Sequence, residues 1–264
     1  QTVRPRDTSR SLNNIHNSYN TVGLVLAYSI SYGISARMTK QILRDVHNIS
    51  ISHQTVLNYL QNVSGLVWNF IQKYQGVVND TQISGDETYI RITDKWGYTW
   101  FVIGAQSKAL LAFNISDNRG VLPALSTLTK VMENVPDSSN IEFIADGNPS
   151  YDAAVHAFNA TSDNKSIVRR KVIGLSNDDD ESEKYRLLKQ LIERLNRTYK
   201  FHTRARYGFK NTNGAMVLTT LFVAYYNFLR PHSSLNFNTP IHVPELDNIT
   251  TIQGKWLKML ELAA

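Results

Sequence analysis

The sequence predicts an α/β fold: a mixed five-stranded sheet flanked by helices and preceded by a small all-helical unit. Two observations lead to this prediction. Residues 20–75 carry helical apolar periodicity, whereas from residue 82 the period becomes that of strands. The later segments then follow the order three strands, helix, strand, helix, strand, helix, which favours a mixed sheet with helices on both faces.

The predicted strands are connected by short turns or by single helices. The first three are joined by short turns, so they should form an antiparallel meander. The helix at 121–135 is amphipathic, and Pro149 suits the first turn of the helix that carries residues 151–158. The strands are expected at 82–92, 97–105, 109–115, 141–145 and 167–173.

Composition bounds the function. The net charge of +6 favours a polyanionic partner, most simply nucleic acid. There is no cysteine, which excludes disulfides and thiolate metal sites and fits a reducing compartment such as the cytoplasm. The longest apolar helical run, 215–229, is short for a membrane span, so we expect no membrane association and a core helix under the sheet.

The chain is expected to divide into four parts. Residues 1–19 carry three arginines and one acid, which indicates a mobile basic arm or a linker. Residues 20–75 form a helical DNA-binding unit, and 76–240 form the body that holds the sheet. Residues 241–264 form a tail with a short helix that packs on the body or on a second protomer.

A helix-turn-helix pattern lies within the second part. Ser35 and Ser52 are suited to cap two helices that flank a short turn. Gln54, Thr55 and Asn58 would then face outward near the start of the second helix, where base edges are read. Two helices that only pack on the rest of the chain remain the alternative. The inward faces are expected to hold Met38, Ile42, Leu43 and Val46 in the first helix and Val56, Tyr59, Leu60 and Val63 in the second.

The first predicted strand carries two adjacent carboxylates, Asp86 and Glu87. Successive strand side chains point to opposite faces, so only one of the two can face a given site. An unpaired buried charge is costly, so a mid-strand carboxylate suggests a metal ion or another charged group. The alternative is an edge strand whose carboxylates face solvent. Trp96 and Trp100 nearby are expected to pack in the core or at a turn.

Two further carboxylates follow. Asp146 ends the fourth predicted strand, and Glu193 lies on a later helix at the head of a face that includes Asn196, Arg197 and Lys200. The segment 194–210 is basic and aromatic without an acid, which is typical of a phosphate-binding track; it also contains Arg204 and Arg206. The acidic run 178–183 is interpreted as a solvated helix start.

If the helix packs across the sheet, Asp86, Asp146 and Glu193 can meet at one rim. Hard oxygen ligands suit Mg²⁺, which favours a few carboxylates together with substrate phosphate. Two such ions roughly 3.5–4 Å apart can activate a hydroxyl and stabilise a leaving oxygen in phosphoryl transfer.

Four blocks of the sequence also occur together in a familiar order. They are GDETYIRI at 85–92, IADGNPSY at 144–151, IERLNRTYKFHTRARYGF at 192–209 and YYNFLRPH at 225–232. Together they resemble the DDE transposases of prokaryotic insertion sequences, members of the retroviral-integrase superfamily with a ribonuclease-H-like fold. The resemblance covers roughly residues 34–240.

The resemblance implies a function and its residues. Asp86, Asp146 and Glu193 would be the catalytic and metal-binding triad for two Mg²⁺ (or Mn²⁺) ions. Asn196, Arg197 and Lys200 would lie along the DNA. The enzyme would bind the terminal inverted repeats of its element, cut strands and join them to target DNA. It would act as a homodimer or higher homo-oligomer on DNA, associated with the nucleoid.

One departure from the family pattern concerns the third carboxylate. Glu193 follows Asp146 by 47 residues, a longer gap than in the integrases. Insertions around 159–165 and 177–183 could absorb the excess, which leaves Glu181 and Glu183 as alternative ligands. Glu193 is preferred for its Asn-Arg-Lys context.

Two other functions compete with a transposase. A ribonuclease-H-like nuclease without strand transfer would not need a helix-turn-helix for base readout. A domesticated DNA-binding protein without catalysis would not need all three carboxylates, and loss of function would usually remove at least one.

Overall fold

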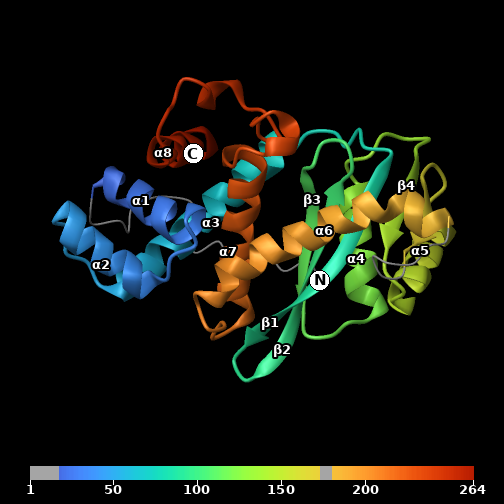
Figure 1. Cartoon of the computed structure of the whole chain (residues 1–264), viewed down its shortest axis with the longest axis horizontal. Helices are drawn as coiled ribbons and strands as arrows, with labels where there is room; N and C mark the ends of the chain where they lie inside the picture. The colour runs from blue at the N-terminus through green and yellow to red at the C-terminus, as the bar shows by residue number, and fades with distance from the viewer. Residues whose placement is uncertain (1–17, 173–179) are drawn as a thin grey trace. The chain divides into compact units, whose positions relative to one another are not determined.

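The computed structural model describes residues 18–172 and 180–264, which form two compact units (Figure 1). Unit 1 contains Gly76–Tyr199, and unit 2 combines the described residues up to Gln75 with Lys200–Ala264. Helix α6 (Asp180–Arg204) contributes its first part to unit 1 and its last turns to unit 2. The four-part division predicted above stays a prediction, and residues 1–17 of the expected basic arm lie outside the described residues.

Unit 1 is built on one mixed sheet with the strand order β3-β2-β1-β4-β5. β1, β2 and β3 pair antiparallel, as the predicted meander requires, whereas β4 pairs parallel with β1 and with β5. The predicted ribonuclease-H-like, five-stranded α/β fold is therefore confirmed. The strands are β1 (Gln82–Ile92), β2 (Lys95–Gly104), β3 (Leu110–Ser116), β4 (Asn140–Ala145) and β5 (Ser166–Lys171).

β1 is the central strand, so the edge-strand alternative for its carboxylates is wrong. Its aliphatic and aromatic residues favour a strand, and its partners β2 and β4 cover both edges of its first part. Pairing with β4 ends at Ser84, whereas pairing with β2 continues to Ile92. β1 therefore runs past the end of β4.

Helices cover both faces of this sheet (Figure 1). α4 (Val121–Met132) and α5 (Pro149–Thr161) lie on one face, since Tyr151 of α5 contacts Glu87. α6 lies on the other face, since Asn196 contacts Asp86, the neighbour of Glu87 that points the opposite way. The start of α5 is fixed by the predicted proline, with Asn148 as the capping residue.

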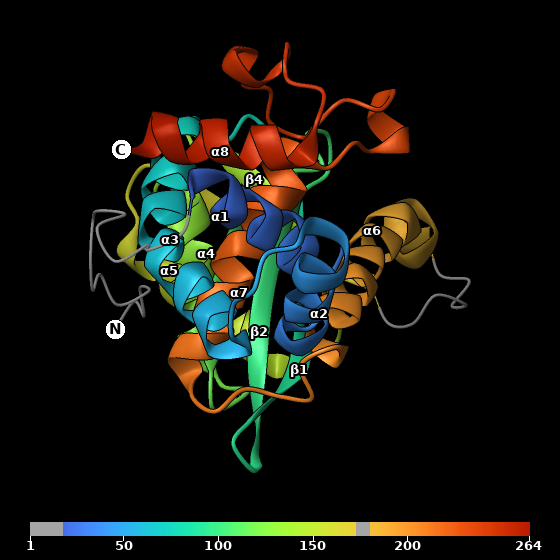
Figure 2. The same ribbon diagram turned by 90° about the vertical axis from the view of Figure 1, so that its left-hand side faces the viewer.

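The N-terminal part of unit 2 holds the predicted pair of capped helices. The Ser35 side chain accepts a hydrogen bond from the backbone N–H of Met38, and that of Ser52 accepts one from Thr55. The second helix, α3, is long and ends at Tyr74, within the helical unit expected at residues 20–75 (Figure 2). The elements are α1 (Tyr19–Leu26), the π-helical η2 (Ala27–Ser31), α2 (Ala36–His47) and α3 (His53–Tyr74).

The inward faces of the two helices were predicted with different success. In α3 all four predicted residues are buried. In α2, Leu43 is buried, but Met38 is 54% exposed and Val46 is 70% exposed. The reason is that α2 buries only a narrow stripe, with Thr39 and Leu43 one turn apart.

The C-terminal part of unit 2 is also helical. α7, expected under the sheet, packs against α3 instead, a long helix of the same unit that buries its largely apolar surface. α8 packs against α1 and α3, and the Trp256 indole donates a 2.9 Å hydrogen bond to Ser31 Oγ. The elements are α7 (Thr212–Ala224), η3 (Tyr225–Leu229), η4 (Ser233–Leu235), η5 (Pro244–Leu246) and α8 (Ile252–Ala263).

Within residues 18–172 and 180–264, no helix combines the length and the apolar character that crossing a membrane requires.

Candidate functional site

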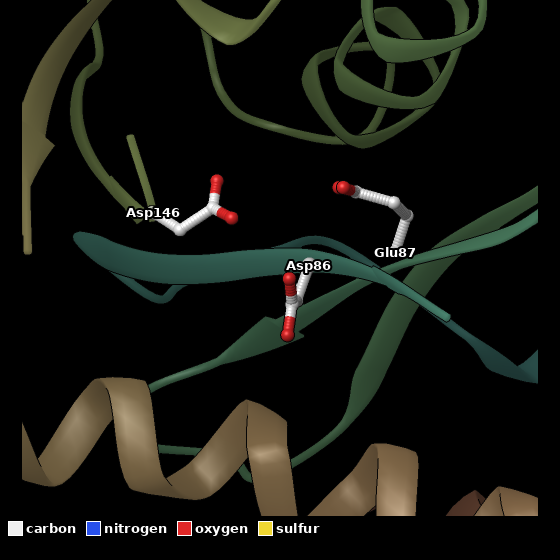
Figure 3. Close-up of side chains that lie close together, drawn as sticks. All are labelled: Asp86, Glu87 and Asp146. Carbon is white, nitrogen blue, oxygen red and sulfur yellow. The ribbon is translucent and has the colours of Figure 1, made fainter. Parts of the chain in front are cut away.

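Three carboxylates gather where β1 passes the end of β4. Each of Asp86, Glu87 and Asp146 offers an oxygen within 4.8 Å of the others. Figure 3 shows Glu87 and Asp146 on one side of β1 and Asp86 on the other. Asp146 reaches the group because it directly follows Ala145, the last residue of β4, which runs parallel to β1. The predicted meeting of the first two carboxylates is therefore seen.

Asp86 is held by two side chains of α6. Lys189 Nζ lies 3.5 Å from Asp86 Oδ2, and the Asn196 amide donates a 3.0 Å hydrogen bond to the same oxygen. Burial raises the pKa of Asp86 to about 6; Glu87 and Asp146 add to this rise, and Lys189 opposes it. The charge of Asp86 is thus costly in the absence of a further cation.

Glu87 is the most deeply buried of the three, with its side chain 1% exposed. Its Oε1 accepts hydrogen bonds from Arg119 Nε and from the Asn148 amide, and its Oε2 accepts one of 2.6 Å from the Tyr151 hydroxyl. Both oxygens are therefore engaged by protein donors. We interpret Glu87 as a structural residue that holds the side chains of Arg119, Asn148 and Tyr151 in place on this face of the sheet.

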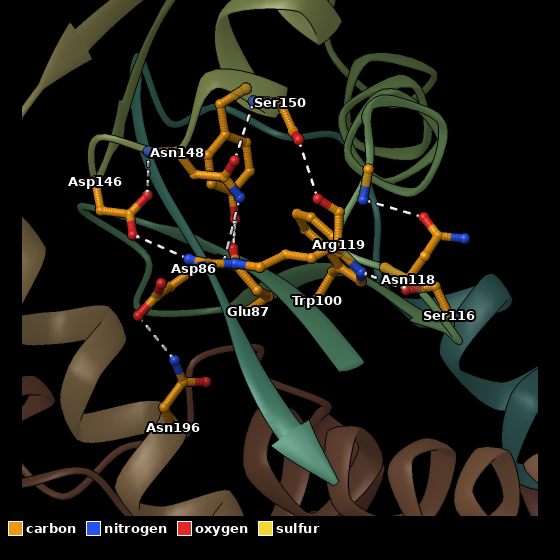
Figure 4. A network of polar contacts seen from close by, with 12 residues as sticks. Asp86, Glu87, Trp100, Ser116, Asn118, Arg119, Asp146, Asn148, Ser150 and Asn196 are labelled. Carbon is orange, nitrogen blue, oxygen red and sulfur yellow. Dashed lines mark hydrogen bonds and ion pairs between the residues drawn. The ribbon is translucent and has the colours of Figure 1, made fainter. Parts of the chain in front are cut away.

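Arg119 links the two carboxylates on that side (Figure 4). Its Nη2 lies 3.4 Å from Asp146 Oδ2 while its Nε pairs with Glu87. The backbone N–H of Asn148 donates a 3.0 Å hydrogen bond to the other oxygen of Asp146. The Ser150 hydroxyl donates to the backbone carbonyl of Arg119. Asp146 is thus oriented from two directions.

Glu193 lies on the face of α6 that contacts Asp86. It stands four residues after Lys189 and three before Asn196, so all three share one side of the helix. Its side chain is half-buried. Glu193 is nevertheless not among the carboxylates that lie within 4.8 Å of one another in the described residues. Of the alternatives, Glu183 is exposed, and the side chain of Glu181 lies outside the described residues.

The donor set fits a divalent metal. Carboxylate oxygens are the ligands that Mg²⁺ takes in proteins, and two of them here belong to the predicted triad. Asn196 Oδ1 is buried beside Asp86 and has no hydrogen-bond partner among the described residues, which suits a water held by a metal ion. Lys189 supplies the positive charge next to Asp86 in this structure.

The residues predicted to read bases lie at the start of α3. Gln54 and Asn58 are exposed, and the Gln54 amide donates a 2.9 Å hydrogen bond to Asn58 Oδ1. Thr55 is half-buried, and its hydroxyl bonds to that of Ser52 at the helix cap. Gln54 and Asn58 are thus one turn apart on an exposed face.

The residues predicted to track phosphates lie in different surroundings. Arg197 and Arg204 are exposed, and Lys200 is half-buried. Asn196 is buried and engaged with Asp86. Arg206 is committed to protein contacts, because its guanidinium donates to the backbone carbonyls of His202 and of Ser29.

Lys189 and Arg119 are site residues that sequence reasoning missed. Lys189 could have been found, since it precedes Glu193 by one helical turn. Arg119 had no such signal: it lies between β3 and α4, and only the folded sheet brings it to Glu87 and Asp146.

A family model and several curated proteins match this chain in sequence. A family model described as "DDE domain" matches residues 81–221, just over half of the chain. The transposase for insertion sequence-like element IS431mec from Staphylococcus aureus, strains Mu50 and N315, is 28% identical over 90 residues, which cover 34% of this chain. The match spans 39% of the length of those curated relatives.

Two solved structures are also similar at low scores. A simian T-cell lymphotropic virus intasome in complex with PP2A regulatory subunit B56 gamma has a TM-score of 0.42 and 16% identity, over 67% of this chain and 61% of that chain. The HTLV-2 integrase catalytic core domain in complex with magnesium (trimeric form) has a TM-score of 0.39 and 11% identity, over 62% and 96%. Because the family model extends over more than half of its residues, this chain belongs to the DDE domain family of insertion-sequence transposases.

Proposed function

We propose that this protein is a DNA transposase that cuts DNA at the ends of its element and joins the freed ends to target DNA. The observation that carries this proposal is the position of Asp86 and Asp146 at one rim of the sheet, opposite the face of α6 that presents Glu193. Membership of the DDE domain family supports the same reaction class.

Asp86, Asp146 and Glu193 are proposed to hold one or two Mg²⁺ (or Mn²⁺) ions. Bound there, the ions would activate a hydroxyl nucleophile and stabilise the leaving oxygen of an in-line phosphoryl transfer. The chain itself orients the ligands: Asn196 and Lys189 hold Asp86, and Arg119 with the Asn148 N–H holds Asp146. Glu193 completes the set through a rotamer change or a small shift of α6.

Recognition of DNA is assigned to two sets of residues. Gln54, Thr55 and Asn58 are proposed to read bases of the terminal inverted repeat, because they stand at the start of the second helix of a helix-turn-helix. Phosphate contacts are proposed for three basic residues of α6: Arg197, Lys200 and Arg204. Asn196 and Arg206 were also expected along this track, but their side chains are engaged by protein contacts. We also propose that the protein acts as a homodimer or larger homo-oligomer on the two ends of its element, and that it is located at the nucleoid.

The test is a Mg²⁺-dependent cleavage and joining assay on DNA that carries the inverted repeats flanking the source locus. Asp86→Asn, Asp146→Asn and Glu193→Gln should each abolish both steps. The matched control is Glu133→Gln, an exposed carboxylate just after α4 that lies outside the carboxylate group, and it should cut and join like the unmodified protein.

Other results would change the assignment. Cutting without joining would indicate a nuclease, and specific binding without cutting would indicate a DNA-binding protein. If Glu193→Gln stayed active while Glu183→Gln did not, the third ligand would be Glu183.

A further inference from the structure

The hairpin of β1 and β2 projects beyond the rest of the sheet in unit 1 (Figures 1 and 2). β1 pairs with β4 only as far as Ser84, and the pairing of β2 with β3 starts at Tyr98. Residues 89–97 therefore form a two-stranded ribbon with no further strand on either side among the described strands. The ribbon leaves the sheet at the rim that holds Asp86 and Asp146.

One face of this ribbon is aromatic and exposed. Tyr89 faces Tyr98 across the two strands, and Arg91 faces Trp96. Trp96 is 61% exposed and Tyr89 is 48% exposed, so Trp96 does not pack in the core. It lies instead just after the turn that joins the two strands. We call Tyr89, Arg91, Trp96 and Tyr98 the ribbon patch.

The ribbon patch is ordered by its own contacts. The Tyr89 ring lies edge-to-face with Trp96 at 6.1 Å and tilted against Tyr98 at 5.0 Å. The Arg91 guanidinium lies 6.0 Å from the Trp96 ring centre. These contacts fix the positions of the rings without covering them. Apolar surface thus stays exposed to solvent, which is typical of a surface that binds a ligand.

The ribbon patch follows the candidate site along β1. Alternate residues of a strand share a face, so Tyr89 and Arg91 lie on the same face as Glu87, which Arg119 joins to Asp146. At about 3.3 Å per residue, Tyr89 stands roughly 10 Å and Arg91 roughly 17 Å along β1 from Asp86. A strand in duplex DNA advances about 3.4 Å per nucleotide along the axis, and an unpaired strand is more extended, so these distances span no more than about three to five nucleotides.

We propose that the ribbon patch stacks on unpaired bases of the DNA strand, within about five nucleotides of the phosphate held at Asp86 and Asp146. This inference rests on the proposed function, since it takes DNA as the substrate. Aromatic faces suit single strands, because every base has a π-face and stacking needs no particular sequence. Arg91 and Lys95 against the single acid Asp94 give the ribbon a charge that complements phosphate.

The test uses the full chain with Asp86→Asn as background, so that bound DNA is not cut. The first probe is a fluorescein-labelled single-stranded oligonucleotide, measured by anisotropy beside a random duplex. Trp96→Ala should weaken single-strand binding roughly five- to 100-fold, with the duplex little changed. Trp96→Phe, which keeps a π-face, should recover most of the affinity. Phe237→Ala, a change of an exposed aromatic residue in unit 2, is the matched control and should bind like the background.

The second probe locates the bases. 2-Aminopurine is placed singly at positions one to eight from the expected cleavage site, in DNA that carries the inverted repeat of the source locus. Fluorescence should change most within positions one to five and should lose that maximum in Trp96→Ala.

Two results would overturn the proposal. One is equal single-strand binding by Trp96→Ala and the background. The other is a change in sedimentation by Trp96→Ala with unchanged binding of DNA, which would make the ribbon patch a contact between copies of this chain. Failure of the proposed function looks different: the protein with Asp86 restored would neither cut nor join, while the effect of Trp96→Ala on single-strand binding persisted.

Discussion

The Asn196 side-chain amide donates a 3.0 Å hydrogen bond to Oδ2 of Asp86, so a residue of helix α6 orients the first carboxylate of the candidate site. Residues that orient a metal ligand usually affect metal affinity roughly 10- to 100-fold when they are changed. The family resemblance alone assigned Asn196 to the DNA track. Its burial and its contact favour a role in positioning Asp86.

Asn196→Ala is therefore expected to weaken Mn²⁺ binding roughly 10- to 100-fold, measured by the loss of the free-ion electron paramagnetic resonance signal. Gln190→Ala on the same helix is the control, because Gln190 contacts Arg194 and not Asp86. If both variants bound Mn²⁺ like the unmodified protein, Asn196 would have no part in positioning the ligand, and its DNA role would be favoured again.

Asp86→Asn is expected to stabilise the metal-free protein at neutral pH. The pKa of Asp86 in the fold is about 6, above the value of 3.8 expected when unfolded, so the folded state binds the proton more tightly. Stability from this group is therefore present at low pH and is lost as the pH rises from about 4 to 6 and beyond. Asn resembles the protonated form and avoids a cost of about 3 kcal/mol at pH 7.5.

Chemical denaturation at several pH values checks this prediction. The gain of Asp86→Asn should shrink to about half between pH 7.5 and pH 5. Mg²⁺ should stabilise the unmodified protein much more than the variant, because only the former regains a cation at this carboxylate. A gain that is the same at both pH values would show that the ionisation of Asp86 is not its source.

Arg119→Met is expected to destabilise the fold by on the order of 3 kcal/mol, because it leaves the carboxylate of Glu87 buried without its cation. Glu87→Gln combined with Arg119→Met should recover much of this loss, since no unpaired charge then remains. A double-mutant cycle from urea denaturation measures the coupling. Additive losses would mean that the Glu87–Arg119 pair is not coupled.

The helix-turn-helix makes a separate prediction. Changing Gln54, Thr55 and Asn58 to Ala should lower binding to the terminal inverted repeat while sparing binding to random duplex, because base contacts specify and phosphate contacts do not. Thr55 bonds to Ser52 at the helix cap, so the double variant that changes only Gln54 and Asn58 to Ala separates readout from capping. Equal loss of affinity for both DNAs would show that α3 contacts only the DNA backbone and reads no bases.

The sheet could be predicted from sequence because its signals are local. All five strands begin and end within three residues of their expected positions, since β-branched and aromatic runs are bounded by short turns. The helix caps at Ser35 and Ser52 were predictable for the same reason. Asp86 and Asp146 were expected at one rim if a helix packed across the sheet, and they meet there because β4 runs parallel to β1 and ends beside it.

Other parts depend on contacts between distant residues. Nothing near Arg119 in the sequence indicates that it joins Glu87 to Asp146. The exposure of Trp96 follows from where β3 and β4 stop, not from its own strand, which looks like a core strand in sequence. The packing of α7 on α3 likewise requires knowing which helix covers which apolar surface.

The basic face of α6 supplies the last prediction. Arg197 is exposed, Lys200 is half-buried, and each phosphate neutralised by such a residue releases condensed counterions. Log K for duplex DNA should then fall with log salt at about 0.9 per contact. Changing Arg197 and Lys200 together to Ala should weaken binding to all sequences alike and flatten the slope by about two units.

Arg206→Ala is the matched control, because the Arg206 guanidinium donates hydrogen bonds to two backbone carbonyls. This variant should have a lower melting temperature and an unchanged salt slope. An unchanged slope in the double variant would remove Arg197 and Lys200 from the DNA track, whereas a flatter slope in Arg206→Ala would add Arg206 to it.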